Sequence, residues 1–180
     1  VREEDFISAS RVRLSDRRLN HILDVHKACL GDILRVGKLN GKMGKGKVTS
    51  IDQKAVELEL ELNQEPPRPL DINIVMAMPR PKVLRRLVQD MTSMGIKNIY
   101  LIKTWKVEKS FWNSPILDED KLRETMILGL EQAKDTILPK IEVYKRFKPF
   151  VEDELTGIIK DRDCLIGHPD SDGICARTYK

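Results

Sequence analysis

The spacing of apolar residues changes near residue 70 of this 180-residue chain. Before that point, short apolar runs alternate with polar residues, most clearly in Ala55–Leu62. Strict alternation is typical of an antiparallel strand with one buried face. Residues 11–14 and 33–36 are shorter runs of the same extended kind. The first third of the chain therefore predicts several short strands.

One helix and one tight turn interrupt these strands. Ser15 or Asp16 can cap a helix over residues 17–27, whose apolar positions recur at helical spacing. Asn40-Gly41 predicts a type I′ hairpin turn, because both central residues of that turn need a positive φ. Together these features predict a small β-barrel or sandwich around one helix, over residues 1–66.

The second part of the chain has the pattern of a parallel α/β fold. A proline-rich linker, with three prolines between residues 66 and 69, stays extended and separates the two parts. Residues 72–78 are almost continuously apolar, as in a central parallel strand. An amphipathic helix over 82–94, which Gly95 ends, leads to another strand at 96–102. This β-α-β order predicts a parallel crossover, so we expect an α/β domain over residues 70–180.

Further elements continue the same pattern. A long helix over 118–134 has a stripe of apolar residues, and a connection with a short strand follows at 136–143. A short helix is expected after residues 147–150. Cys164–Gly167 is apolar enough to form another strand, which would run into His168.

Composition excludes several classes of protein. No apolar run reaches the length of a membrane span, and the first residues have no secretory pattern. We therefore expect a cytoplasmic protein with no membrane partner. The cysteines and histidines show no metal-ligand spacing, so no metal site is expected and the three cysteines are read as free thiols. At least one of His21 and His26 is expected in the core.

Positive charge is concentrated in two segments. Residues 11–47 contain ten Lys and Arg against three acids, and residues 80–109 contain eight against two. Segregated charge of this kind suits a polyanion such as RNA, although a solvated basic surface without a partner is the simpler alternative. Trp105 and other aromatic residues lie among the bases of the second segment, where they could stack on nucleotides or only pin a loop. The candidate RNA contacts are Arg11, Arg13, Arg17, Arg18, Arg35, Lys45, Lys47, Lys106 and Lys109.

Three smaller groups are candidate ligand contacts. Arg80 and Lys82 follow a buried strand, where α/β sheets bind ligands, and Pro79 and Pro81 stiffen the chain around them. They could bind phosphate or merely flank the helix start. His168-Pro169 could form the lip of a pocket after the Cys164–Gly167 strand, and Glu131-Gln132 could bind a polar ligand or lie on the solvent face of its helix.

The chain resembles the RsmE family of 16S ribosomal RNA uridine-N3 methyltransferases, which belong to the SPOUT class of knotted enzymes. In the first part the resemblance rests on residues 11–14, 21–27 and 31–36. In the second part it rests on Met78-Pro79-Arg80-Pro81-Lys82, on Met94-Gly95-Ile96, and on the residues from Glu131-Gln132-Ala133-Lys134 to Pro139-Lys140-Ile141.

The resemblance implies a PUA-like RNA-binding β-barrel followed by a SPOUT-type α/β domain. It also implies S-adenosylmethionine as the cofactor, methylation of a uridine N3 in 16S ribosomal RNA of the small ribosomal subunit, and a homodimer. Uridine N3 is weakly acidic, so the reaction needs the uridine ring held in place and its negative charge stabilised as the proton leaves. The residues expected to stabilise that negative charge are Arg80, Lys82 and Arg85. The residues expected to contact the cofactor are Glu131, Gln132, Ile166, Gly167, His168 and Pro169.

The sequence also departs from the family pattern. The arginine that follows the family's Glu-Gln pair falls at or beside Asp135, and Lys134 is the nearest base. The family's Ile-Gly-Pro-Glu-Gly-Gly loop and its later knot segment are not among these residues. We therefore expect an incomplete SPOUT domain without a complete cofactor pocket. Two alternatives remain open, namely a non-catalytic RNA-binding module and an assembly protein that uses the 118–134 helix as its interface.

Overall fold

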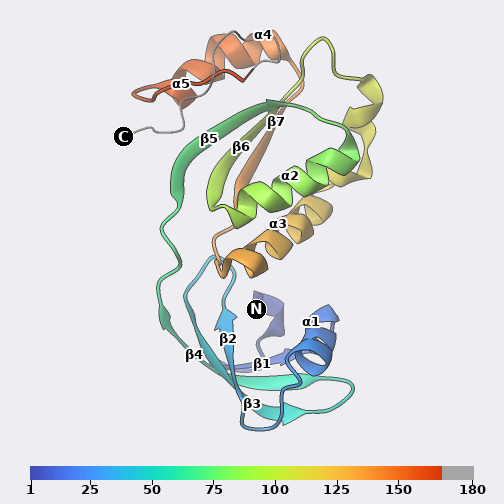
Figure 1. The fold of residues 1–180 in the computed structure, drawn as a ribbon, viewed down its shortest axis with the longest axis vertical. Coiled ribbons are helices and arrows are strands. Elements are labelled where there is room, and N and C mark those ends of the chain that lie inside the picture. The colour runs from blue at the N-terminus through green and yellow to red at the C-terminus, as the bar shows by residue number, and fades with distance from the viewer. Residues whose placement is uncertain (168–180) are drawn as a thin grey trace. The chain divides into compact units, whose positions relative to one another are not determined.

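The computed structural model describes residues 1–167. The chain forms two compact units, Val1–Lys145 and Arg146–Lys180, which we describe separately. The first unit contains two sheets (Figure 1). The domain boundary expected between residues 66 and 70 stays a prediction.

The first sheet is antiparallel and has the strand order β1-β4-β3-β2. Its hydrophobic core is formed by alternate residues of the strands and by one face of a short helical segment. Val12, Leu58 and Leu19 are three of its buried members. The elements are a 3₁₀ turn η1 (Glu3–Asp5), β1 (Arg11–Leu14), α1 (Arg17–Asn20), the π-helical turn η2 (His21–Val25), β2 (Ile33–Gly37), β3 (Met43–Ile51) and β4 (Val56–Gln64).

Two details of this sheet differ from expectation. The described strands do not close into a barrel, because β1 pairs with β4 and β2 pairs with β3, so both remain edge strands. The β2–β3 connection is a tight turn, but only Asn40 has a positive φ (56°), so the type I′ assignment is wrong. The turn instead closes with a hydrogen bond from the Gly41 N–H to the Lys38 carbonyl, 2.8 Å.

The second sheet is parallel, with the order β5-β6-β7, as the β-α-β pattern predicts. Helices α2 and α3 pack against each other and against one face of this sheet, where Leu84, Ile99 and Met126 are buried together (Figure 1). Gly95 ends the α2 connection with φ 85°, as expected. The elements are β5 (Leu70–Ala77), α2 (Pro81–Ser93), β6 (Ile96–Ile102), the 3₁₀ turns η3 (Lys109–Asn113) and η4 (Pro115–Leu117), α3 (Glu119–Ala133) and β7 (Lys140–Tyr144).

The Asn40 turn of the first sheet binds the loop between α3 and β7. The Asn40 N–H donates to the Thr136 carbonyl (2.8 Å), and the Thr136 hydroxyl donates to the Gly41 carbonyl (2.5 Å). The Leu138 N–H donates to Asn40 Oδ1 at 3.0 Å. These bonds fix one end of the hairpin against the parallel sheet and its helices, which explains why Asn40 does not need an ideal two-residue turn.

The second unit has three short helical elements, α4 (Phe147–Pro149), η5 (Phe150–Glu154) and α5 (Leu155–Ile159). The strand expected at Cys164–Gly167 is not formed. This run has no ladder partner among the described residues, and Ile166 is 89% exposed, which an apolar strand in a sheet would not be. His168 and Pro169 lie outside the described residues.

Residues 1–167 lack two kinds of feature. None of their helices is both long and apolar enough to cross a membrane. No group of three or more His, Cys, Asp or Glu side chains among them is arranged to hold a metal ion. Cys29 and Cys164 are free, exposed thiols.

Candidate nucleic-acid interface

Basic residues follow every strand of the parallel sheet at its carboxyl edge. Backbone hydrogen bonds hold the three strand exits together, from the Met78 N–H to the Ile102 carbonyl (3.0 Å) and from the Lys103 N–H to the Tyr144 carbonyl (2.9 Å). This edge is where parallel α/β sheets bind their ligands. We call it the carboxyl edge and define it by Arg80 and Lys82 after β5, Lys103 and Lys106 after β6, and Lys145 after β7.

No acid among the described residues pairs with Arg80, Lys82, Lys103 or Lys145. Arg80 is the N-cap residue of α2, and Pro81 occupies the first turn, so the backbone that carries these bases is stiff. Arg80 and Lys82 are exposed. The positive end of the α2 dipole adds to the potential of the side chains. The carboxyl edge is therefore suited to bind phosphate groups.

Arg85 lies farther along α2 and is also exposed, without an ion pair in the described part of the chain. It stands one turn after Pro81, close enough in sequence to extend the same positive potential. Its predicted catalytic role, like those of Arg80 and Lys82, stays a prediction.

The aromatic residues that follow β6 divide into two groups. Trp105 is 89% exposed, and the ammonium of Lys106 lies 5.1 Å from its ring centroid. Trp112 instead packs into the core, 9% exposed. Trp105 can therefore offer an open ring face for stacking, whereas Trp112 only pins the loop. Lys109, at the start of η3, is exposed.

Three of the candidate bases in the first sheet are held by acids. Arg11 pairs with Glu57 (3.2 Å), and Arg17 binds Glu131 through both of its terminal nitrogens. The hydrogen bond to Glu131 raises the pKa of Arg17. Their charge toward an external polyanion is therefore partly neutralised.

Arg18 is the most enclosed of these bases. It bridges Asp5 and Asp16, and its side chain is 18% exposed. Burial alone would lower the pKa of Arg18, but the hydrogen bonds that Arg18 donates to both acids outweigh it and raise that pKa. Four further predicted RNA contacts on the first sheet are free of ion pairs with the described residues, and they are Arg13, Arg35, Lys45 and Lys47.

The predicted cofactor contacts that the structure describes belong to both units, and their role stays a prediction. Glu131 and Gln132 lie near the carboxyl end of α3, where the next loop binds Lys97 at the start of β6. They are therefore at the edge of the sheet opposite Arg80, and Glu131 is already engaged by Arg17. Ile166 and Gly167 belong to the second unit, in no regular element.

Sequence reasoning missed Lys103 and Lys145 as site residues. The signal was present, because each directly follows a parallel strand, and carboxyl ends of parallel strands meet at one edge. Lys103 was hidden by the aromatic residues after it. Lys145 was hidden because the short β7 strand had no sharp predicted end.

The chain is similar to known RNA methyltransferases. A family model described as "RNA methyltransferase domain" matches residues 66–177. "Ribosomal RNA small subunit methyltransferase E" of Treponema pallidum is 33% identical over 136 residues, which cover 75% of this chain and 51% of the relative. "Ribosomal RNA small subunit methyltransferase E 1" of Borreliella burgdorferi is 28% identical over 137 residues, covering 76% and 58%. The chain thus spans little more than half the length of these curated relatives.

A solved structure shows the same fold. The crystal structure of a ribosomal RNA small subunit methyltransferase E from Neisseria gonorrhoeae, bound to S-adenosyl methionine, superposes with a TM-score of 0.54. It is 14% identical, and the match covers 80% of this chain and 61% of the gonococcal chain. From the family match and the two relatives, the chain belongs to the RNA methyltransferase domain family, as an RsmE-like member.

Proposed function

We propose that this protein acts in the methylation of ribosomal RNA of the small subunit, at N3 of a uridine in 16S rRNA. The observation that carries the proposal is the carboxyl edge, where basic residues follow all three parallel strands in a domain of this family. The names of the two spirochaete relatives support the substrate class. The choice of uridine N3 rests on the family resemblance alone.

The chemistry that we assign to the carboxyl edge is positioning and charge stabilisation. Phosphate groups would contact Lys103 and Lys145, while the exposed ring of Trp105 would stack on an unpaired base. When N3 of a uridine loses its proton, negative charge spreads onto the carbonyl oxygens of the ring. Arg80 and Lys82 lie on a stiff backbone and have no acid partner among residues 1–167, and they would stabilise that charge. Arg85 is proposed as a third contributor.

S-adenosylmethionine is the proposed methyl donor, because the gonococcal relative of the same fold was solved with it. The roles of the six residues predicted to hold it stay a prediction, and His168 and Pro169 lie outside the described residues. Glu131 is held by Arg17, and Ile166 is 89% exposed in a run without regular structure. Calorimetric titration with S-adenosylmethionine can check whether this chain binds the cofactor.

Three further features belong to this proposal. The open four-stranded sheet would act as a PUA-like RNA-binding module, because four of its bases are exposed and free of ion pairs with residues 1–167. The family implies a homodimer. Ribosomal RNA as the substrate implies a cytoplasmic location.

The test is RNA binding as a function of salt. A fluorescently labelled fragment of unmodified 16S rRNA is titrated with the wild-type chain and with Lys103→Gln/Lys145→Gln, which removes the two proposed phosphate contacts. Each lost phosphate contact should reduce the slope of log K against log [salt] by about 1. The control, Lys54→Gln, removes a base from the exposed turn between β3 and β4 and should leave the slope unchanged. An unchanged slope in the double variant would remove the carboxyl edge from the interface.

A second candidate function, a non-catalytic RNA-binding module, is favoured by one observation. Glu131, a predicted cofactor contact, is already bound by Arg17, whereas Arg80, Lys82, Lys103 and Lys145 have no acid partner among residues 1–167. The two candidates differ in one outcome, since only the methyltransferase changes the methylation state of the RNA.

A further inference from the structure

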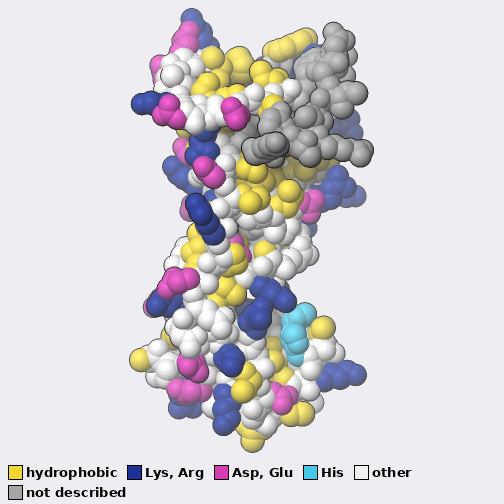
Figure 2. All heavy atoms as spheres, turned by 60° about the vertical axis from the view of Figure 1, so that its left-hand side comes forward, with side chains coloured by type: hydrophobic (Ala, Val, Ile, Leu, Met, Phe, Trp, Pro, Cys, Tyr) yellow, Lys and Arg dark blue, Asp and Glu magenta, His cyan; other side chains and the backbone are white. Residues whose placement is uncertain are grey.

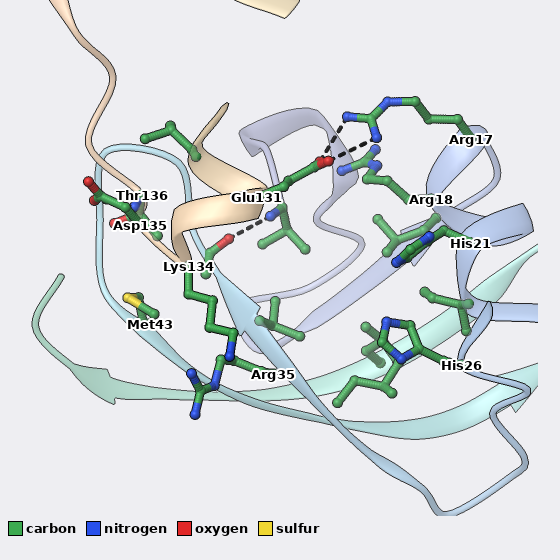
Figure 3. Close-up of a pocket in the computed structure, with 18 residues that line it drawn as sticks. Arg17, Arg18, His21, His26, Arg35, Met43, Glu131, Lys134, Asp135 and Thr136 are labelled. Carbon is green, nitrogen blue, oxygen red and sulfur yellow. Dashed lines mark hydrogen bonds and ion pairs between the residues drawn. The ribbon is translucent and has the colours of Figure 1, made fainter. Parts of the chain in front are cut away.

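A cavity of about 600 Å³ lies inside the first unit, away from the carboxyl edge. Its walls come from segments far apart in the sequence, namely α1 and η2, the edge strand β2, and the end of α3 (Figure 3). Its volume is within the range of small-molecule sites, roughly 300–1,000 Å³. The carboxyl edge does not use this space, and Glu131, the predicted cofactor contact on its wall, is bound by Arg17.

The acids around the cavity are already satisfied. Glu131 is bound by both terminal nitrogens of Arg17. Asp135 accepts from the ammonium of Lys97 and from the backbone N–H groups of Thr136 and Ile137. Neither carboxylate is therefore left to neutralise other cations on the walls.

Two cations on the walls have no acid partner among residues 1–167. They are Arg35 of β2 and Lys134, which directly follows α3. Figure 3 shows the Lys134 side chain extending from the end of α3 toward Arg35. Two like charges that converge without an acid between them make a position that favours an anion, and an arginine fork suits a phosphate.

A pair of rings lines the same cavity. His21 and His26 contact each other edge to face, with ring centroids 4.9 Å apart. Both are exposed, so the expectation that one lies in the core is wrong. Figure 2 shows histidine side chains beside a group of Lys and Arg side chains. Behind the rings, the floor is apolar, with Ile22 and Leu34.

We propose that this cavity binds one unstacked nucleotide, with the base against the histidine rings and apolar floor and the phosphate between Arg35 and Lys134. Rings and apolar side chains accept the flat face of any base, and the two cations supply the charge that the phosphate needs. The proposal rests on the proposed RNA function, for which it supplies a second contact that would hold an unpaired nucleotide away from the reacting uridine.

The test uses uridine 5′-monophosphate, uridine and a short single-stranded oligouridylate as probes, with isothermal titration calorimetry and fluorescence anisotropy. The monophosphate should bind more tightly than uridine. Arg35→Gln and Lys134→Asn should each weaken its binding by at least about fivefold, since each removes a charged phosphate contact. Asparagine is chosen at Lys134 because that residue has φ 53°, which asparagine tolerates. Lys54→Gln, outside the cavity, should change nothing.

The probes also show whether the bound nucleotide is free or part of an RNA. They keep this test separate from the test of the proposed function. If both variants weaken oligouridylate binding as well, the cavity holds a nucleotide of RNA. If they weaken only the monophosphate, it holds a free nucleotide. Unchanged monophosphate binding in both variants, or no binding to the wild type at about 1 mM, would overturn the proposal. Because no methyl transfer is measured, this failure is distinct from failure of the proposed function.

Discussion

The guanidinium of Arg17 binds the carboxylate of Glu131 through two hydrogen bonds of 2.9 and 2.8 Å, across 114 residues of sequence. The pair joins the helix of the first sheet to the end of α3. It therefore engages a predicted RNA contact and a predicted cofactor contact with each other. We infer that this pair stabilises the fold by joining these two segments.

A double-mutant cycle at Arg17 and Glu131 tests that reading. Both side chains are more than two-fifths exposed (44% and 43%), so solvent screens the pair. We expect a coupling free energy of unfolding of about 0.5–1 kcal/mol from Arg17→Ala, Glu131→Ala and the double variant, measured by urea denaturation. The coupling should shrink at high salt. A coupling of zero at low salt would mean that the pair does not join the two segments in solution.

The buried pair of Lys97 and Asp135 should matter more. The ammonium lies 2.5 Å from the carboxylate, with the side chains 11% and 4% exposed, and it also donates to the Ile137 carbonyl. Lys97→Met should lower the free energy of unfolding by about 3–5 kcal/mol, because it leaves a buried carboxylate without its counter-charge. The matched control is Lys121→Met, whose pair with Asp118 is mostly exposed, and it should change stability by less than about 0.5 kcal/mol. Similar effects of the two substitutions would contradict the burial of the Lys97 pair.

Two helical glycines should respond to alanine in opposite directions. A Cβ at Gly129 of α3 would lie 2.6 Å from the Gln89 carbonyl oxygen of α2, so the helices would have to separate. Gly129→Ala should destabilise the protein by about 1–3 kcal/mol. At Gly157 of α5 a Cβ would meet nothing within 4 Å, and alanine should stabilise that helix by about 0.5–1 kcal/mol. Thermal denaturation followed by circular dichroism measures both, and a neutral Gly129→Ala would show that α2 and α3 are not so close.

The Asp16 carboxylate predicts how the stability of the protein changes at acidic pH. Its side chain caps α1 and binds Arg18, and chiefly this side-chain hydrogen bond lowers the pKa of Asp16 from 3.8 to about 2. A lowered carboxyl pKa contributes stability that is present above pH 3.8 and is lost as the pH falls toward 2. Because the side chain is 47% exposed, we expect a contribution of about 1 kcal/mol or less.

Asp16→Asn keeps the cap and removes the charge. Its free energy of unfolding should vary less than that of the wild type as the pH falls from 3.8 toward 2. The control, Asp90→Asn, changes an exposed carboxylate without an ion pair in the described residues. Its free energy of unfolding should fall on acidification as that of the wild type does. If the two variants lose stability in parallel on acidification, the Asp16–Arg18 interaction is not the cause.

Much of the fold could be predicted because its determinants are local. The alternation in β4, the Asp16 cap and the Gly95 stop each depend on neighbouring residues. The conformation of Asn40 is not determined by its neighbours in the sequence alone. The dipeptide Asn40-Gly41 indicates a turn correctly, but hydrogen bonds to the distant Thr136 determine its conformation.

The site was harder to predict because charge partners are distant. Arg17 and Arg13 look alike in the sequence, yet only Arg17 meets an acid from α3. Glu131 likewise looked free. The carboxyl edge was predictable in part, since Arg80 follows an unmistakable strand, whereas the edge position of Lys145 depends on the pairing of β7 with β6.

The most direct test of the central claim is mass spectrometry of nucleosides from 16S rRNA, isolated from source cells with and without the gene that encodes this chain. The proposed function predicts 3-methyluridine in the parent, its loss without the gene, and its return when the wild-type gene is restored. Restoration with Arg80→Gln/Lys82→Gln should return much less of it. Unchanged 3-methyluridine in cells without the gene would contradict the claim that this protein methylates small-subunit ribosomal RNA.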